Sequence, residues 1–352
     1  MHSDIAIIGL GAITSVGLNV AATAAAVRAG IDGFEEHPFM ISQEGEPYIL
    51  GMVPVVEPEL FGTQRMLKLA VAAAEEALIP LKKQISLMGT IITITGLPET
   101  RPGIPDGLEL PIKDNLSSHS NYSLKNFYTL QHGYSSGLMA MQHAKKILSN
   151  GECDFCLVGG VDSYIDPDML DWIEENEQLH TPDNAWGFIP GEASGYCLLC
   201  TIETSQRLQL PIKAFLGDSA SYMEINKIKT ETVCIGEGLT KAVKQVTEPL
   251  TDSTKLDYMI CDMNGDAYRA DEFGFMLARL SNRFKDPSNF LAPADCWGDI
   301  GAASGPLYVS LLSVAAEKSY SEGSNNLLWT SSENGERSST IIKTVNQQQG
   351  IY

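Results

Sequence analysis

Hydrophobic and polar positions follow two periods along the chain. Short apolar runs rich in β-branched residues are typical of buried strands, and they alternate with segments whose apolar residues recur every three or four positions, as in helices. In the first half, strands are predicted within 4–17, 88–96, 127–130, 151–163 and 195–203, and helices within 19–30, 65–78 and 134–148. The first strand is expected to run into a glycine turn, and Leu97–Ser123 is polar without clear periodicity.

The second half repeats this alternation. Strands are predicted within 210–221, 256–266, 325–332 and 339–345, and helices within 235–250 and 301–317. Two strand-rich halves with interleaved helices indicate a layered α/β protein built by duplication. The division is predicted near the middle, giving units of residues 1–205 and 206–352.

Composition narrows the function classes. The 352 residues carry 44 Asp and Glu against 24 Lys and Arg, a formal net charge of −20. Nucleic acid is therefore not an expected partner, because its phosphates would be repelled. No apolar run approaches the roughly 18 residues that span a bilayer, so no membrane partner is expected. The N-terminus enters a strand at once, and a cytoplasmic protein is predicted.

Two Cys-x-x-Cys pairs, Cys153/Cys156 and Cys197/Cys200, raise the question of a metal site. Both pairs lie in apolar, strand-like runs, where residues three apart point to opposite faces. Neither pair is then expected to chelate one ion. We predict reduced core cysteines, no metal and no cofactor.

Two glycine motifs suggest other chemistries. "GLGAITSVG" resembles a dinucleotide-binding loop, but Thr14 stands where the third glycine is required. "GYSSG", residues 133–137, matches a nucleophile elbow with Ser135 as the nucleophile of a hydrolase. After Ser135 the only histidines are His143 and His180, which leaves little chain for the acid and base of a triad. His132 is expected to be a packed strand-end residue.

Four stretches, taken in order, resemble the β-ketoacyl synthases of the thiolase superfamily. They are "IAIIGLGAITSVG", "GYSSGLMAMQHAKKILSNGECDFCLVGGVDS", "WGFIPGEAS" and "WGDIGAASG". The resemblance implies a five-layered αβαβα fold with two related halves and a two-fold dimer. It also implies a catalytic cysteine at a helix N-terminus and two histidines from the second half.

This sequence departs from that catalytic set. Tyr134 falls at the cysteine position, Asn264 or its neighbour at the first histidine, and Gly298 or Asp299 at the second. No histidine occurs after His180. The family's lysine before the second histidine is also missing, and its glycine-rich C-terminal gate is replaced by "SSENGERS". A phenol near pKa 10 without a neighbouring base is a poor nucleophile. No working catalytic residue is expected.

A condensing fold without its chemistry resembles the chain length factors of type II polyketide synthases and aryl-polyene systems. Such a subunit pairs with an active ketosynthase and shapes the tunnel for the growing chain. The better-known factors carry Gln where this chain has Tyr134, and the chain is shortened between Gly96 and Tyr134. Tunnel or interface positions are predicted at Tyr122, Phe127, Tyr128, Tyr134 and Leu138. Asn264 is the expected hydrogen-bond partner of a buried Tyr134.

The predicted partners are an active ketosynthase and, through it, an acyl carrier protein, because an acidic carrier would be repelled by a chain of charge −20. By itself the chain is not expected to be an enzyme, although it would belong to a complex of the acyltransferase class. Two alternatives stay open. One is a divergent acyltransferase, decarboxylase or hydrolase using Tyr134, Ser135 or Asp299, and the other is a homodimeric scaffold.

Overall fold

The computed structural model describes residues 5–82, 89–119, 124–228, 230, 232–251 and 254–345. The strands are β1 (Ile5–Thr14), β2 (Glu35–Ile41), β3 (Pro47–Leu50), β4 (Ile91–Gly96), β5 (Leu124–Leu130), β6 (Phe155–Ser163), β7 (Glu192–Thr201), β8 (Ala214–Met223), β9 (Tyr258–Cys261), β10 (Phe290–Leu291), β11 (Asn325–Ser331) and β12 (Glu336–Thr344). The helices are α1 (Val20–Ala29), α2 (Gly62–Ala77), α3 (Ile79–Lys82), α4 (Glu109–His119), α5 (Ser136–Ser149), α6 (Pro167–Glu175), α7 (Ile202–Arg207), α8 (Glu237–Thr247), α9 (Ala267–Leu280), α10 (Ala294–Trp297) and α11 (Ser304–Glu317).

Ten of these strands form one sheet with the order β10-β9-β11-β12-β8-β1-β7-β6-β4-β5, and β2 pairs with β3 separately. Read outward from the β8–β1 junction, both sides have the same pattern, so the fold is duplicated. The junction itself is short and antiparallel, from Ile5 opposite Leu216 to Ile7 opposite Ala214. The predicted division between residues 205 and 206 falls within α7 and stays a prediction.

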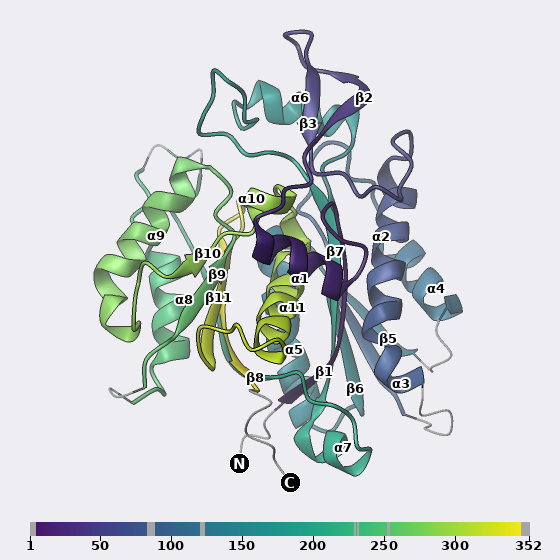
Figure 1. The fold of residues 1–352 in the computed structure, drawn as a ribbon, viewed down its shortest axis with the longest axis vertical. Helices are drawn as coiled ribbons and strands as arrows, with labels where there is room; N and C mark the ends of the chain where they lie inside the picture. The colour runs from purple at the N-terminus through teal and green to yellow at the C-terminus, as the bar shows by residue number, and fades with distance from the viewer. Residues whose placement is uncertain are drawn as a thin grey trace.

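The elements stack in five layers (Figure 1). α5 and α11 lie between the two halves of the sheet, α2 and α4 cover the outer face of the first half, and α8 and α9 cover that of the second. α11 is almost entirely buried, which explains why its apolar residues continue around the helix rather than forming one stripe. This is the αβαβα arrangement that the resemblance implies.

The predicted first strand and the glycine turn after it are confirmed. β1 runs through Gly9 and Gly11 to Thr14, and the chain then turns to Gly17, whose backbone N–H donates to the carbonyl of Thr14 at 3.3 Å. A Cβ added at Gly11 would lie 1.8 Å from the carbonyl oxygen of Ala73, so this glycine lets α2 pack directly on the strand backbone. In the segment that lacked periodicity, α4 forms over Glu109–His119.

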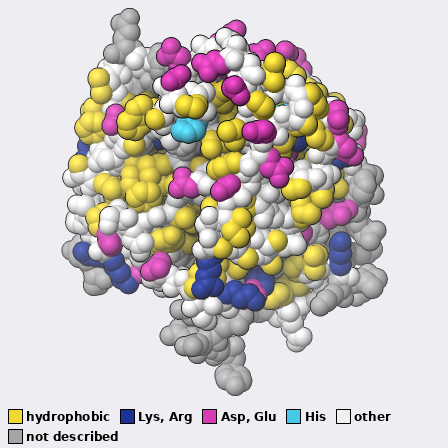
Figure 2. Space-filling model, turned by 45° about the horizontal axis from the view of Figure 1, so that its top comes forward, with side chains coloured by type: hydrophobic (Ala, Val, Ile, Leu, Met, Phe, Trp, Pro, Cys, Tyr) yellow, Lys and Arg dark blue, Asp and Glu magenta, His cyan; other side chains and the backbone are white. Residues whose placement is uncertain are grey.

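Surface charge is dispersed on the face drawn in Figure 2. Asp and Glu side chains are scattered over this face, and Lys and Arg lie mainly toward its lower rim. Among the residues that the structure describes, no helix has both the length and the apolar character needed to cross a membrane.

Candidate functional site

The site is built on the corner between β5 and α5. Gly133 has a φ of +53°, a left-handed conformation that favours glycine, and it opens the single 3-10 turn Gly133–Ser135 that leads into α5. A Cβ added there would lie 2.9 Å from Cγ of Glu99. The turn places Tyr134 inward, with only 4% of its surface exposed.

The Tyr134 hydroxyl is held by two oxygen atoms. It donates to Oδ2 of Asp299 at 2.7 Å and lies 2.9 Å from the hydroxyl of Tyr164. Burial, together with the negative charge of Asp299, raises the pKa of Tyr134 well above its ordinary value. The phenol is therefore a neutral hydrogen-bond donor. The guanidinium carbon of Arg269 lies 4.1 Å from the ring centroid of Tyr134, on its face.

Asp299 is the centre of this hydrogen-bonded group. Its Oδ2 also accepts from Nδ2 of Asn264 at 2.5 Å, and its Oδ1 accepts from the backbone N–H of Gly301 at 3.0 Å. The expectation that Asn264 bonds Tyr134 directly was wrong, because both side chains bond the same carboxylate. Of the two candidates for the second histidine position, Asp299 supplies the side chain, whereas Gly298 turns the backbone with a φ of +78°.

Buried ion pairs surround the group. Arg101 pairs with Asp162 and stacks on the ring of Tyr164, with its guanidinium carbon 4.0 Å from the centroid. Although burial opposes the charged form, Asp162 holds the pKa of Arg101 above its ordinary value. Arg269 pairs with Asp262 at 2.9 Å on the other side. Each of the two arginines is thus paired with a buried carboxylate, whereas Asp299 is held by neutral hydrogen-bond donors.

Ser135 is not assembled as a nucleophile. Its side chain is buried, and its hydroxyl donates to the backbone carbonyl of Glu336 at 2.9 Å. His132, the nearest histidine in sequence, instead places Nδ1 2.9 Å from Oε1 of Glu336. Within the described residues, Ser135 makes no hydrogen bond to a histidine, so the arrangement that an elbow hydrolase requires does not form here.

The predicted tunnel residues have different environments. Tyr128 lies on the edge strand β5 with 48% of its surface exposed, and Phe127 is half-buried against the core. Leu138 is buried in the central core beside α11. Tyr122 lies outside the described residues. The role of these positions in a tunnel stays a prediction.

A cavity of about 420 Å³ opens beside Tyr134. Tyr164, Trp172 and Phe188 provide aromatic walls, and Glu99 lies at the corner glycine. Burial raises the pKa of Glu99 to about 7, and the neighbouring carboxylates Glu333 and Glu336 add to the effect. Sequence reasoning missed Glu99 and Tyr164, because neither lies in a recognisable motif.

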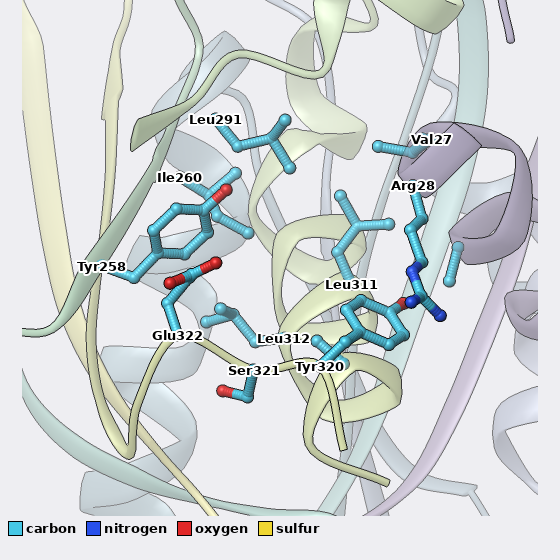
Figure 3. Close-up of a pocket in the computed structure, with 12 residues that line it drawn as sticks. Val27, Arg28, Tyr258, Ile260, Leu291, Leu311, Leu312, Tyr320, Ser321 and Glu322 are labelled. Carbon is cyan, nitrogen blue, oxygen red and sulfur yellow. The ribbon is translucent and has the colours of Figure 1, made fainter. Parts of the chain in front are cut away.

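A separate cavity of about 220 Å³ lies between α1 and α11 and is drawn in Figure 3. Leu291, Leu311 and Leu312 give it an apolar lining, and Arg28 stacks on the ring of Tyr320 at its rim, 3.9 Å from the centroid. It shares no lining residue with the corner cavity.

The cysteines depart from expectation at one pair. The sulfur atoms of Cys153 and Cys156 are 3.6 Å apart, so the expectation that they point away from each other was wrong. Cys153 precedes β6, and strand alternation does not govern it. Cys197 and Cys200 do lie in different core clusters, on opposite faces of β7.

Within the described part of the chain, one group has the spacing to hold a metal ion: Glu224, Cys234 and Glu272. Both carboxylates of this group already have partners within the protein. Glu272 pairs with Arg337 and accepts from the hydroxyl of Ser331, while Glu224 accepts from the backbone N–H of Gly238 at 2.7 Å. The group therefore provides the internal contacts of a packed core.

The segment that contains the β5–α5 corner matches a known protein family. Residues 128–205 match the family model of the beta-ketoacyl synthase N-terminal domain, and this range contains both Tyr134 and β6. The predicted resemblance to the β-ketoacyl synthases is confirmed. No curated protein matches this ketosynthase-like sequence.

Solved ketosynthase structures match almost the whole chain. "The ishigamide ketosynthase/chain length factor" superposes with a TM-score of 0.80 at 17% identity, over 98% of this chain and 100% of that chain. A type II PKS acyl-carrier protein in complex with its ketosynthase bound to the hexaketide (AntDE:AntF) gives 0.78 at 16% identity, over 98% and 100%. The ketosynthase from module 6 of the bacillaene synthase of Bacillus subtilis 168 gives 0.78 at 15% identity, over 97% and 72%. These matches confirm the thiolase-like ketosynthase fold.

Proposed function

We propose that this chain is a non-catalytic, ketosynthase-like chain length factor. It pairs with an active β-ketoacyl synthase and shapes the tunnel for the growing chain. One observation carries the proposal. Tyr134 stands at the nucleophile position as a neutral phenol that donates to the buried carboxylate of Asp299.

This arrangement is unsuited to acyl transfer. A nucleophile of this kind needs an ionised or base-activated atom, whereas the Tyr134 proton is held by an acceptor whose negative charge disfavours phenolate. The sequence after His180 contains no histidine to support decarboxylation or an oxyanion. The corner therefore retains its shape and lacks the groups that would perform the condensation.

The sheet offers an edge for pairing. β5 ends the sheet order and bonds only β4, so its other edge is free within the described chain. Exposed edge strands readily pair with another chain unless they are protected. Tyr128 extends from this strand into solvent. A partner strand along β5 would cover Tyr128 and bring a second corner close to that of Tyr134.

The net charge of this chain favours docking of the acyl carrier protein on the other subunit of such a pair. With a net charge of −20, this chain would repel an acidic acyl carrier protein, so the carrier would dock on the active subunit. Comparable carrier binding by this chain alone and by the pair would contradict this part of the proposal.

Co-expression with a candidate active ketosynthase, followed by native mass spectrometry, tests the proposal. We expect a one-to-one complex, and no acyl adduct on Tyr134 or Ser135 after incubation with acylated carrier protein. Tyr128→Asp should weaken the complex. Phe275→Asp serves as the control, because Phe275 is 38% exposed on α9, in the outer helix layer of the other half. A self-sufficient homodimer that ignores the synthase, or an adduct on either residue, would refute the proposal.

A further inference from the structure

The contact between Cys153 and Cys156 sets these two thiols apart from the other cysteines of the chain. Their sulfur atoms lie 3.6 Å apart, which is a direct thiol–thiol contact. The contact forms because Cys153 lies in the turn between α5 and β6, while Cys156 is the second residue of the strand. Regular strand geometry would separate them, so the turn is what brings the sulfur atoms together.

The two thiols differ in accessibility. Cys153 is partly exposed and lines a cavity of about 570 Å³, together with Thr90, Glu152 and Asp154. Cys156 is completely buried and does not line that cavity. A small reagent can therefore reach Cys153 first, and Cys156 only through Cys153.

The pKa values of the two thiols also differ, and the more accessible thiol, Cys153, is the more acidic. With Cys156 as the donor, the hydrogen bond between the two thiols lowers the pKa of Cys153, although burial and the charge of Asp154 act in the opposite direction. The same bond, together with burial, raises the pKa of Cys156. The accessible sulfur is thus the one whose thiolate is favoured, and thiolate is the reactive form in disulfide exchange.

We propose that Cys153 and Cys156 are a reactive dithiol that forms a reversible disulfide by exchange with low-molecular-weight disulfides. The Cys153 thiolate attacks one sulfur of the reagent, which forms a mixed disulfide and releases one thiolate. The Cys156 sulfur then attacks Cys153, displaces the second reagent thiol and transfers its proton to it. Two protein thiols are oxidised and one reagent disulfide is reduced to two thiols. This modification site does not depend on the proposed function.

Reaction of the fully reduced chain with oxidised glutathione tests the site. Intact-mass analysis should show the loss of two hydrogens, and peptide mapping should place the disulfide at 153–156. Dithiothreitol should reverse it. Cys153→Ser should abolish the product, whereas Cys156→Ala should stop at a glutathione adduct on Cys153. The variant in which Cys197 and Cys200 are both replaced by Ala is the matched control. That pair has the same spacing but lies on opposite faces, so the control should react like the wild type.

A second probe avoids replacing the buried cysteine. Phenylarsine oxide bridges two sulfur atoms that lie close together, so the wild type should bind one equivalent and Cys153→Ser none. A stable glutathione adduct on wild-type Cys153 without closure to Cys156 would overturn the proposal. So would unchanged arsenical binding by Cys153→Ser.

Discussion

The hydrogen bond between Tyr134 and Asp299 makes a quantitative prediction about stability. Tyr134→Phe removes one hydroxyl and leaves the aromatic ring, including its contact with Arg269, in place. The hydroxyl makes two buried contacts, at 2.7 Å to the Asp299 carboxylate and 2.9 Å to the Tyr164 hydroxyl. After the substitution, Asp299 keeps its bonds to Asn264 and Gly301 but loses the hydroxyl donor of Tyr134.

The size of the effect follows from the acceptor. A hydrogen bond to a charged group contributes about 1.5–3 kcal/mol, and a neutral one about 0.5–1.5 kcal/mol. Losing both gives a decrease of roughly 2–4.5 kcal/mol in the free energy of unfolding. Tyr196→Phe is the matched control, because Tyr196 is also fully buried and its hydroxyl bonds the neutral Thr95 hydroxyl, at 2.9 Å. The control should lose about 1 kcal/mol.

Urea unfolding, followed by circular dichroism, measures both variants against the wild type. We expect Tyr134→Phe to be the less stable variant by at least about 1 kcal/mol. The double variant Tyr134→Phe/Asp299→Asn adds a cycle in which the two substitutions should be strongly non-additive. Equal losses for the two Tyr→Phe variants would show that the phenol does not stabilise an ionised Asp299. That result would remove the physical basis of a satisfied, non-catalytic corner.

Three further outcomes are expected. Burial raises the pKa of Glu99 to about 7, so native Glu99 keeps a proton that the unfolded chain releases. The free energy of unfolding should therefore fall as pH rises from about 4.5 to about 7, by at most about 3 kcal/mol. Glu99→Gln should flatten that part of a urea-midpoint profile, and an unchanged slope would contradict the assignment. Arg65→Met leaves the buried carboxylate of Glu192 without its bidentate partner and should cost about 3–5 kcal/mol in thermal or urea unfolding, whereas Lys241→Met in an exposed pair should cost under about 1 kcal/mol. Tyr134→Cys should release no carbon dioxide from a malonyl-carrier substrate, because the chain has no histidine after His180, and measurable release would refute the non-catalytic interpretation.

Most of the fold could be predicted because its elements are strongly patterned. The apolar run of β6 predicts a buried strand, and the helical period of α5 predicts a helix. Both fit the alternation of strands and helices along the chain. α4 was missed because its polar residues cover it nearly all round, leaving little apolar stripe to detect. The first strand and the turn at Gly17 were predicted, but the sequence did not show that Gly11, within β1, allows the close approach of α2.

The site could be predicted only as a set of positions. The motif spacing located Tyr134, Asn264 and the segment at Gly298 and Asp299, but the bonding between them depends on side-chain direction. Gly298 has the positive φ, and the following residue, Asp299, is the one that faces the phenol. Tyr164 and Glu99 could not be anticipated, since they reach the corner from β-strand ends and loops without a motif.

The glycines that begin the corners of the two halves have a packing role. Gly133 and Gly301 begin equivalent turns in the two halves, with φ values of +53° and +44°. A Cβ at Gly301 would lie 1.9 Å from Oδ2 of Asp162, which accepts from the N–H of Ala302 at 2.9 Å and belongs to the carboxylate paired with Arg101. Replacing such a glycine would therefore disturb a buried ion pair whether or not the site were active. A glycine motif in this fold is therefore evidence of close packing. Whether the site can catalyse a reaction depends on the side chain at position 134 and its hydrogen-bond partners.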